Sequence, residues 1–165
     1  MGMVACFAEV DPQMMSRLKA DPSQIEEFLY PDGGEGEPEH YADLDKAWHC
    51  IHFMLTGSSD VGKAAIADAI FGGTEIGNDV GYGPARVLAH EQVGLIASAL
   101  AGVSEDDFKS RFDPNAMQAA EVYLSEMCAE EGDEALEYLV EKFQSLVGFY
   151  RDAASRGNGA VLWVS

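Results

Sequence analysis

A stripe of apolar residues near the C-terminus constrains the fold more than any other feature of the chain. The stripe follows one helical face: Leu136, Leu139, Val140, Phe143, Leu146, Val147 and Tyr150. This spacing predicts an amphipathic helix that must bury one side against other elements. Asp133 is expected as its N-cap. Arg151 and Arg156 complement the negative end of the helix dipole, and Gly157 suits the position after the helix.

Apolar runs at both ends of the chain predict strands. They cover residues 4–10 and 160–164, and residues 86–88 offer a third candidate. Further helices are expected over about 43–56, 63–71 and 91–101, with a short one after residue 104. Three short strands among many helices indicate a small sheet that includes both chain ends and is covered by helices. The prediction is an α+β or α/β fold in a single compact domain of residues 1–165.

Three segments fit neither pattern. Residues 31–39 combine Gly, Pro and like charges, so we predict a mobile loop that tolerates change. Residues 72–84 hold five glycines and are predicted to be irregular. Residues 57–64 nearly match a phosphate-binding loop, but Ala64 stands where the motif needs Ser or Thr, and a helix rather than a strand precedes it. We therefore expect a loop between two helices there, and no nucleotide hydrolysis.

The chain is strongly acidic, with 29 Asp and Glu residues against 10 Lys and Arg and a formal net charge of −19. Such a charge repels the phosphates of nucleic acids and of anionic membranes, so neither is expected as a partner. Two explanations for the acidity stay open. It can serve solubility, or it can dock a basic protein partner.

The cysteines and the N-terminus bear on the compartment. Cys6, Cys50 and Cys128 are odd in number, far apart and in apolar surroundings, which is typical of buried reduced thiols in a cytoplasmic protein. No Cys-x-x-Cys pair is present, so no metal or other cofactor is expected. No apolar run approaches the ~18 residues of a membrane span, and the N-terminus does not read as a signal peptide.

Unusual side chains gather in the tryptophan-containing helix and at the end of the glycine-rich segment. The candidate ligand-binding residues are Trp48, His52, Thr56, Tyr82 and Arg86. Arg86 can hold a carboxylate or phosphate with two hydrogen bonds, or it can form a structural salt bridge. His52 can face a ligand and move a proton near neutral pH, or it can be a buried, hydrogen-bonded structural residue. His49 lies further round the helix and is expected to be solvated.

Several blocks of sequence occur together and in a familiar order. They are Met1-Gly2-Met3 before a strand with Phe7, residues 44–48, 52–57 and 81–86, and Phe149-Tyr150 with Gly157 before the final strand. The chain thereby resembles the YfbM-like family of uncharacterised bacterial proteins. Its Tyr123-Leu124 differs from the Tyr-Pro that family members often carry, which concerns the local turn. The resemblance implies a compact single-domain α/β protein and no reaction, cofactor or catalytic residue.

Two functions compete. The first is a non-catalytic binding or interaction module with an acidic surface, because the chain is small, acidic and without a catalytic motif. The second is a small-ligand-binding protein or enzyme with a pocket between the Trp48 helix and the 72–86 segment, where a small anion would bind. No nucleophile-and-base pair supports catalysis, so the sequence favours the first.

Overall fold

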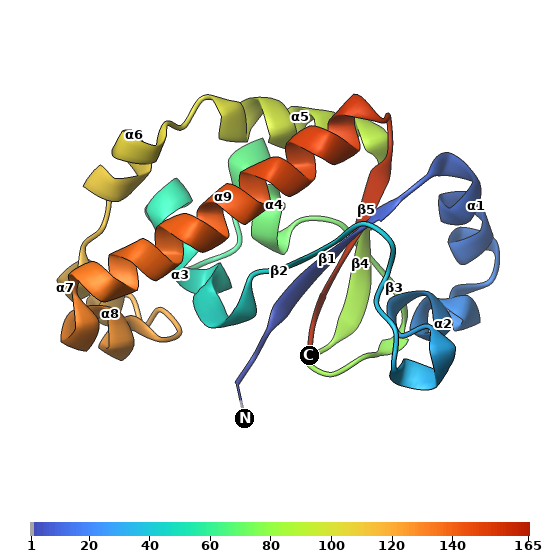
Figure 1. Cartoon of the computed structure of the whole chain (residues 1–165), viewed down its shortest axis with the longest axis horizontal. Helices are drawn as coiled ribbons and strands as arrows, with labels where there is room; N and C mark the ends of the chain where they lie inside the picture. The colour runs from blue at the N-terminus through green and yellow to red at the C-terminus, as the bar shows by residue number, and fades with distance from the viewer. Residues whose placement is uncertain (1) are drawn as a thin grey trace.

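A five-stranded antiparallel sheet forms the centre of the structure (Figure 1), a computed structural model that describes residues 2–165. The strands are β1 (Ala5–Val10), β2 (Tyr41–Asp43), β3 (Thr74–Asp79), β4 (Pro84–Leu88) and β5 (Gly159–Val164). Their order in the sheet is β2-β1-β5-β4-β3, and every neighbouring pair is antiparallel. The fold is therefore α+β rather than α/β, and the prediction that both chain ends enter the sheet is confirmed.

Helices cover both faces of the sheet. The α-helices are α1 (Pro12–Ala20), α2 (Ile25–Leu29), α3 (Trp48–Thr56), α4 (Ala65–Phe71), α5 (His90–Ala101), α6 (Glu105–Ser110), α7 (Pro114–Ala119), α8 (Ser125–Glu131) and α9 (Asp133–Ser155). Short 3-10 helices span Pro22–Gln24, Asp32–Gly34 and Asp45–Ala47. The group around α3, α4, α5 and α9 packs on one face, whereas α1 and α2 pack on the other (Figure 1).

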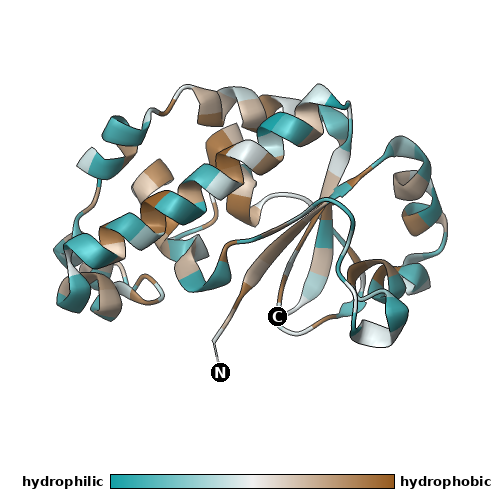
Figure 2. Ribbon diagram, in the orientation of Figure 1, coloured by the Kyte–Doolittle hydropathy of each residue, from teal (hydrophilic) through white to brown (hydrophobic). Residues whose placement is uncertain are grey.

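The two central strands are buried on both faces because their side chains alternate between two cores. Phe7 and Leu162 belong to the larger core under α9, while Ala8 and Trp163 belong to the smaller core under α1 and α2. The same division explains why β1 is apolar at nearly every position. Figure 2 shows the complementary pattern on α9, where hydrophilic and hydrophobic residues alternate along the helix.

The predicted C-terminal helix is confirmed, and its stripe packs against neighbouring helices in the larger core. Phe143 lies flat against Phe108 of α6, with ring centroids 4.0 Å apart. Tyr150 is fully buried and donates a hydrogen bond to the carbonyl oxygen of Ala69 (2.7 Å). Gly157 takes a left-handed φ of 68° just after the helix, as expected.

The expected N-cap of this helix is wrong. Asp133 is already the first helical residue, and the cap position belongs to Gly132, whose φ is 55°. Since α8 ends directly before α9, the chain must reverse within one residue, and glycine reaches that backbone conformation without the steric cost of a Cβ. The acidic side chain still lies in the first turn, where it complements the helix dipole.

Two strands differ from the predictions. The glycine-rich segment is not irregular throughout, because Thr74–Asp79 forms β3 and pairs with β4. Only Ile76 of this edge strand is buried, so the apolar alternation that would have identified it is missing. Gly77, at φ 73°, comes close to Ile25 and interrupts the register. Strand β2 is three residues long, below the length at which a pattern can be recognised.

The segment between α3 and α4 is a helix-to-helix connection, as predicted. Gly57 ends α3 at φ 75°, and α4 starts only at Ala65. The near-match to a phosphate-binding loop therefore lacks the strand that the motif requires. Within residues 2–165, no helix is both long and apolar enough to cross a membrane.

Candidate functional site

Trp48 lies in an aromatic cluster that joins α3 to the segment before α8. Its indole Nε1 donates a hydrogen bond to the carbonyl oxygen of Met3 (2.9 Å), and its ring stacks on Tyr123 with centroids 5.7 Å apart. The ring of Phe71 meets it edge-on. The side chain is 8% exposed, so its contacts anchor the N-terminus and the Tyr123 segment to α3.

His52 is fully buried one turn further along α3. Its Nε2 lies 2.8 Å from the carbonyl oxygen of Asp60. Because a carbonyl only accepts, Nε2 must carry the proton and Nδ1 is left as a bare lone pair with no partner among the described residues. Burial lowers the pKa of His52, which favours this neutral form. Thr56 Oγ1 in turn donates to the His52 carbonyl oxygen (2.9 Å).

Arg86 meets the last turn of α4 from the sheet. Its guanidinium donates to the carbonyl oxygens of Gly72 (2.6 Å) and Ile70 (3.0 Å). These carbonyls have no partner within the helix, so the arginine acts as a C-terminal cap. His52 packs on the intervening Phe71, with ring centroids 4.4 Å apart. The structure thus brings these two candidate residues to the same helix end, each engaged in a structural hydrogen bond.

Tyr82 does not join this group. It lies in the turn between β3 and β4, is 53% exposed, and its backbone N–H donates to the carbonyl oxygen of Val164 (3.0 Å). The ligand-binding role of Trp48, His52, Thr56, Tyr82 and Arg86 stays a prediction. Each of the four that lie away from the turn is committed to a contact within the protein.

The expectation that His49 is solvated is wrong. Its Nδ1 accepts a hydrogen bond from the backbone N–H of Tyr123 (2.9 Å), and its Nε2 lies 2.9 Å from the carbonyl oxygen of Ser59. Both partners lie in irregular segments outside α3, so the periodicity of that helix could not reveal them. The two Nε2 atoms of His49 and His52 therefore face different carbonyls. Within residues 2–165, no group of three His, Cys, Asp or Glu side chains is placed to hold a metal ion.

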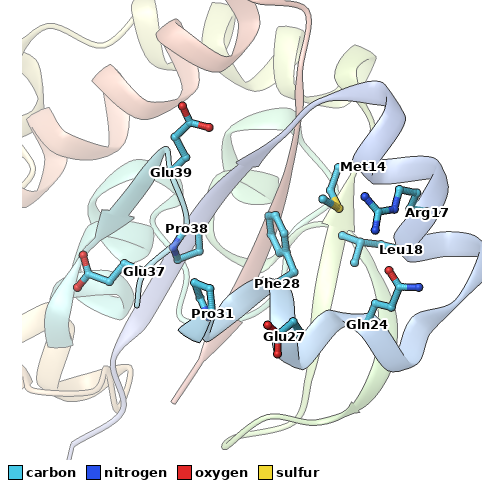
Figure 3. A pocket seen from close by; sticks show the side chains of 10 residues that line it. All are labelled: Met14, Arg17, Leu18, Gln24, Glu27, Phe28, Pro31, Glu37, Pro38 and Glu39. Atoms are coloured by element: carbon cyan, nitrogen blue, oxygen red, sulfur yellow. The ribbon is translucent and has the colours of Figure 1, made fainter. Parts of the chain in front are cut away.

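A pocket of about 590 Å³ lies on the other face of the sheet, between α1, α2 and the 31–39 segment (Figure 3). We call it the α1–α2 pocket. It is lined by Met14, Arg17, Leu18, Gln24, Glu27, Phe28, Pro31, Glu37, Pro38 and Glu39. Its volume falls in the range of ~300–1,000 Å³ that is usual for ligand sites. In Figure 3 the half-buried ring of Phe28 stands at its centre, between two prolines and two side chains of α1.

Local sequence explains how α1 and α2 are held as the walls of this pocket. Asp11 and Asp21 cap the helices that follow them, and a proline comes next in each case. Leu18 and Leu29 then fasten α1 and α2 to the sheet from inside. The 31–39 segment follows α2 and contributes Pro31 and Pro38 to the lining of the pocket. The apolar floor therefore belongs to the smaller core.

The rim of the α1–α2 pocket is charged. Glu27, Glu37 and Glu39 contribute three carboxylates, and Arg17 contributes the single cation of the lining. All four side chains are exposed, and Arg17 forms no salt bridge within residues 2–165. The other polar group of the lining is the amide of Gln24, so the pocket presents carboxylates, one guanidinium and one amide to a bound partner. A sequence pattern could not reveal this site, since α2 is only five residues long and residues 31–39 were predicted only as a loop.

A second, polar pocket of about 510 Å³ lies across β2. Glu9 lies in its wall and accepts hydrogen bonds from Arg156 Nε (2.6 Å), Arg156 Nη2 (2.7 Å) and Asn158 Nδ2 (2.7 Å). The guanidinium holds the pKa of Glu9 below its ordinary value. This bidentate pair satisfies the buried carboxylate, and it also joins β1 to the end of α9. Glu39 lines both pockets, so the acidic rim continues from one to the other.

Comparisons with known proteins agree along the whole length. The model of a family described as a domain of unknown function (DUF1877) matches residues 1–163. Protein YfbM of Escherichia coli (strain K12) is 22% identical over 165 residues, which is 98% of this chain and 97% of that protein. The crystal structure of YfbM from Escherichia coli, a protein of unknown function, superimposes with a TM-score of 0.70 at 20% identity, over 98% of this chain and 99% of the other.

Proposed function

The chain belongs to the DUF1877 family, as its YfbM-like sequence blocks predicted, and we propose that it is a non-catalytic binding protein that docks a basic protein partner. The α1–α2 pocket receives an apolar side chain of that partner, and the acidic rim meets its Lys and Arg residues. The observation that carries this proposal is the combination of an apolar floor with three exposed carboxylates around it. The cytoplasmic location predicted from the free cysteines is part of the same proposal.

The apolar floor supports an anchored contact. Phe28 and Met14 are half-buried and pack against the smaller core, so a side chain entering the pocket would complete their burial. Burying apolar surface contributes roughly 25 cal/mol per Å². In protein interfaces, one aromatic or aliphatic anchor in such a pocket often dominates the binding energy.

Charge selects the partner. Three carboxylates surround the pocket in a chain of net charge −19, so a cationic segment is attracted and an anionic one repelled. Arg17, the one cation of the lining, can pair with a carboxylate of the same partner. A small anion would face three glutamates in addition to this arginine. The rim therefore favours a basic polypeptide over the anionic ligand that the sequence also allowed.

The second candidate function, ligand binding or catalysis beside Trp48, has less support. The guanidinium of Arg86 donates to two backbone carbonyls, and the only side-chain polar atom of His52 without a partner is the buried Nδ1. An incoming anion that took these two donors would displace the carbonyl partners of the arginine. Such an exchange would break the C-terminal cap of α4.

Fluorescence anisotropy with labelled synthetic peptides tests the proposal. The probe is a ten-residue peptide with one Phe or Leu flanked by Lys and Arg, and two control peptides replace either the apolar residue by Ser or the basic residues by Glu. Only the first peptide is expected to bind, with affinity falling as salt rises. Phe28→Ala is expected to weaken binding about tenfold, since it removes the centre of the pocket.

A matched pair of charge variants identifies the site. Neutralising the pocket rim in Glu27→Gln/Glu37→Gln/Glu39→Gln is expected to reduce affinity by about tenfold or more. The control changes three exposed acids of α8 instead, in the variant Glu126→Gln/Glu130→Gln/Glu131→Gln. Equal losses in both variants would mean that only the net charge attracts the peptide, and no binding of the basic apolar peptide at low salt would overturn the proposed function.

A further inference from the structure

Two thiols meet inside the larger core. Cys50 lies on α3 and Cys128 on α8, their Sγ atoms are 3.6 Å apart, and both residues are fully buried. The third cysteine, Cys6, lies on β1 in the other core, next to the hydroxyl of Tyr41. From sequence, all three were expected to be buried thiols far apart in the chain. Their free, buried state is confirmed, but two of them form a pair.

From this contact we propose that Cys50 and Cys128 are a redox-active dithiol, which a peroxide converts into a disulfide between α3 and α8. An S–S bond is about 2.05 Å long, so the sulfur atoms must approach by roughly 1.5 Å. Cys128 lies on a helix of only seven residues, which can shift by this amount more easily than α3 within the core. The proposal is independent of the α1–α2 pocket, which lies on the opposite face of the sheet.

Cys128 is the thiol that reacts first. The hydrogen bond from Cys50 lowers the pKa of Cys128, whereas this same contact and burial raise the pKa of Cys50. The Cys128 thiolate attacks one peroxide oxygen, the O–O bond breaks, and the products are a Cys128 sulfenic acid and water or an alcohol. Cys50 then attacks the Cys128 sulfur and releases water. The two thiols lose two electrons and two protons in total, and the peroxide takes them up.

A peroxide would reach the buried pair by local opening of the segment around α8. Leu124 and Gly132, the residues that bound α8, both have left-handed φ values, 65° and 55°. Glu121, at the start of this segment, has φ 55°. Such a conformation is strained for residues with a Cβ, so the segment stores part of the free energy needed to open it. A seven-residue helix preceded by two such residues, Glu121 and Leu124, opens locally at lower cost than the core beneath it.

Oxidation of the pair would change the surroundings of the Trp48 indole. The single hydrogen of the Cys50 thiol can go to Cys128 or to the carbonyl oxygen of Tyr123, whose distance from Cys50 Sγ is 3.3 Å. A disulfide removes this donor from the Tyr123 segment. Tyr123 stacks on Trp48 and donates its N–H to His49, so a shift of its backbone changes the surroundings of the indole. Redox state and the position of the Tyr123 segment are thereby coupled.

Mass spectrometry of the native full-length protein treated with hydrogen peroxide tests the proposal. We expect a loss of about 2 Da from the intact mass, a peptide linkage between Cys50 and Cys128, and reversal by dithiothreitol. Cys6 is the internal control, because burial raises its pKa to about 11 and no second thiol lies beside it. It should remain free and react with an alkylating agent only after unfolding.

Two variants complete the test. Cys6→Ser is expected to form the disulfide as the wild type does, whereas Cys128→Ser should lose both the linkage and the accompanying change in Trp48 fluorescence. The wild-type linkage map decides the question even if Cys128→Ser fails to fold. Linkage through Cys6, oxidation of Cys50 or Cys128 to unlinked sulfinic acid, or no reaction before global unfolding would each overturn the proposal.

Discussion

Truncating Phe143 to alanine should remove a large part of the stability of this protein. The side chain is 3% exposed and lies flat on the fully buried ring of Phe108. Phenylalanine-to-alanine changes in cores cost about 3–5 kcal/mol, because the apolar contact is lost and a cavity is left. We therefore expect a loss within that range.

Urea unfolding followed by circular dichroism measures this loss. The midpoint should fall while the m-value stays unchanged, because the surface exposed on unfolding is nearly the same. For a domain of this size, a loss of about 4 kcal/mol corresponds to a decrease in Tm of roughly 10 °C. Phe143→Leu is the matched control, since it keeps most of the apolar volume and should cost about half as much.

A double-mutant cycle with Phe108→Ala isolates the contact between the two rings. The double variant should be destabilised by less than the sum of the single variants, because the second truncation removes a ring that has already lost its partner. A loss below about 1 kcal/mol for Phe143→Ala would contradict the packing described here. Strict additivity would show that the stacking itself contributes nothing.

Three further predictions concern the polar network, the loop and the α4 cap. The pKa of Glu9 is lowered in the folded state, so the stability that Glu9 contributes is present above the unfolded pKa of about 4.3 and is lost as pH falls through the folded value. Urea melts at neutral and acid pH should show this loss of stability, and the Glu9→Gln variant should show a smaller one. Deleting residues 33–36 should change stability little, since loop length acts logarithmically, and limited proteolysis should cut the 31–39 segment before α9. Arg86→Ala should destabilise by about 2–3 kcal/mol, because two carbonyls lose a charged partner, whereas the exposed Tyr82→Ala should lie within about 0.5 kcal/mol of wild type by thermal melt.

Sequence periodicity predicted the elements that bury one continuous face. The stripe of α9 and the apolar runs of β1 and β5 are long enough for a pattern to be recognised. It failed for β3, where backbone pairing rather than side-chain burial holds an exposed edge strand. It failed also at Asp133, because the short α8 that occupies the preceding residues left no apolar signal of its own.

The candidate site was harder to predict, because a residue of an uncommon type is not necessarily free to bind a ligand in the folded protein. Arg86 and His52 stood out in the sequence, but each supplies a donor to a carbonyl that irregular backbone leaves in the interior, at the end of α4 and at Asp60. A chain that packs such backbone against a core must provide these partners, whatever it binds. Binding a partner instead requires side chains that folding leaves without a contact inside the protein, and these side chains are of common residue types. Arg17 and Phe28 have this property, and only the tertiary arrangement of α1, α2 and the following loop brings them to one pocket.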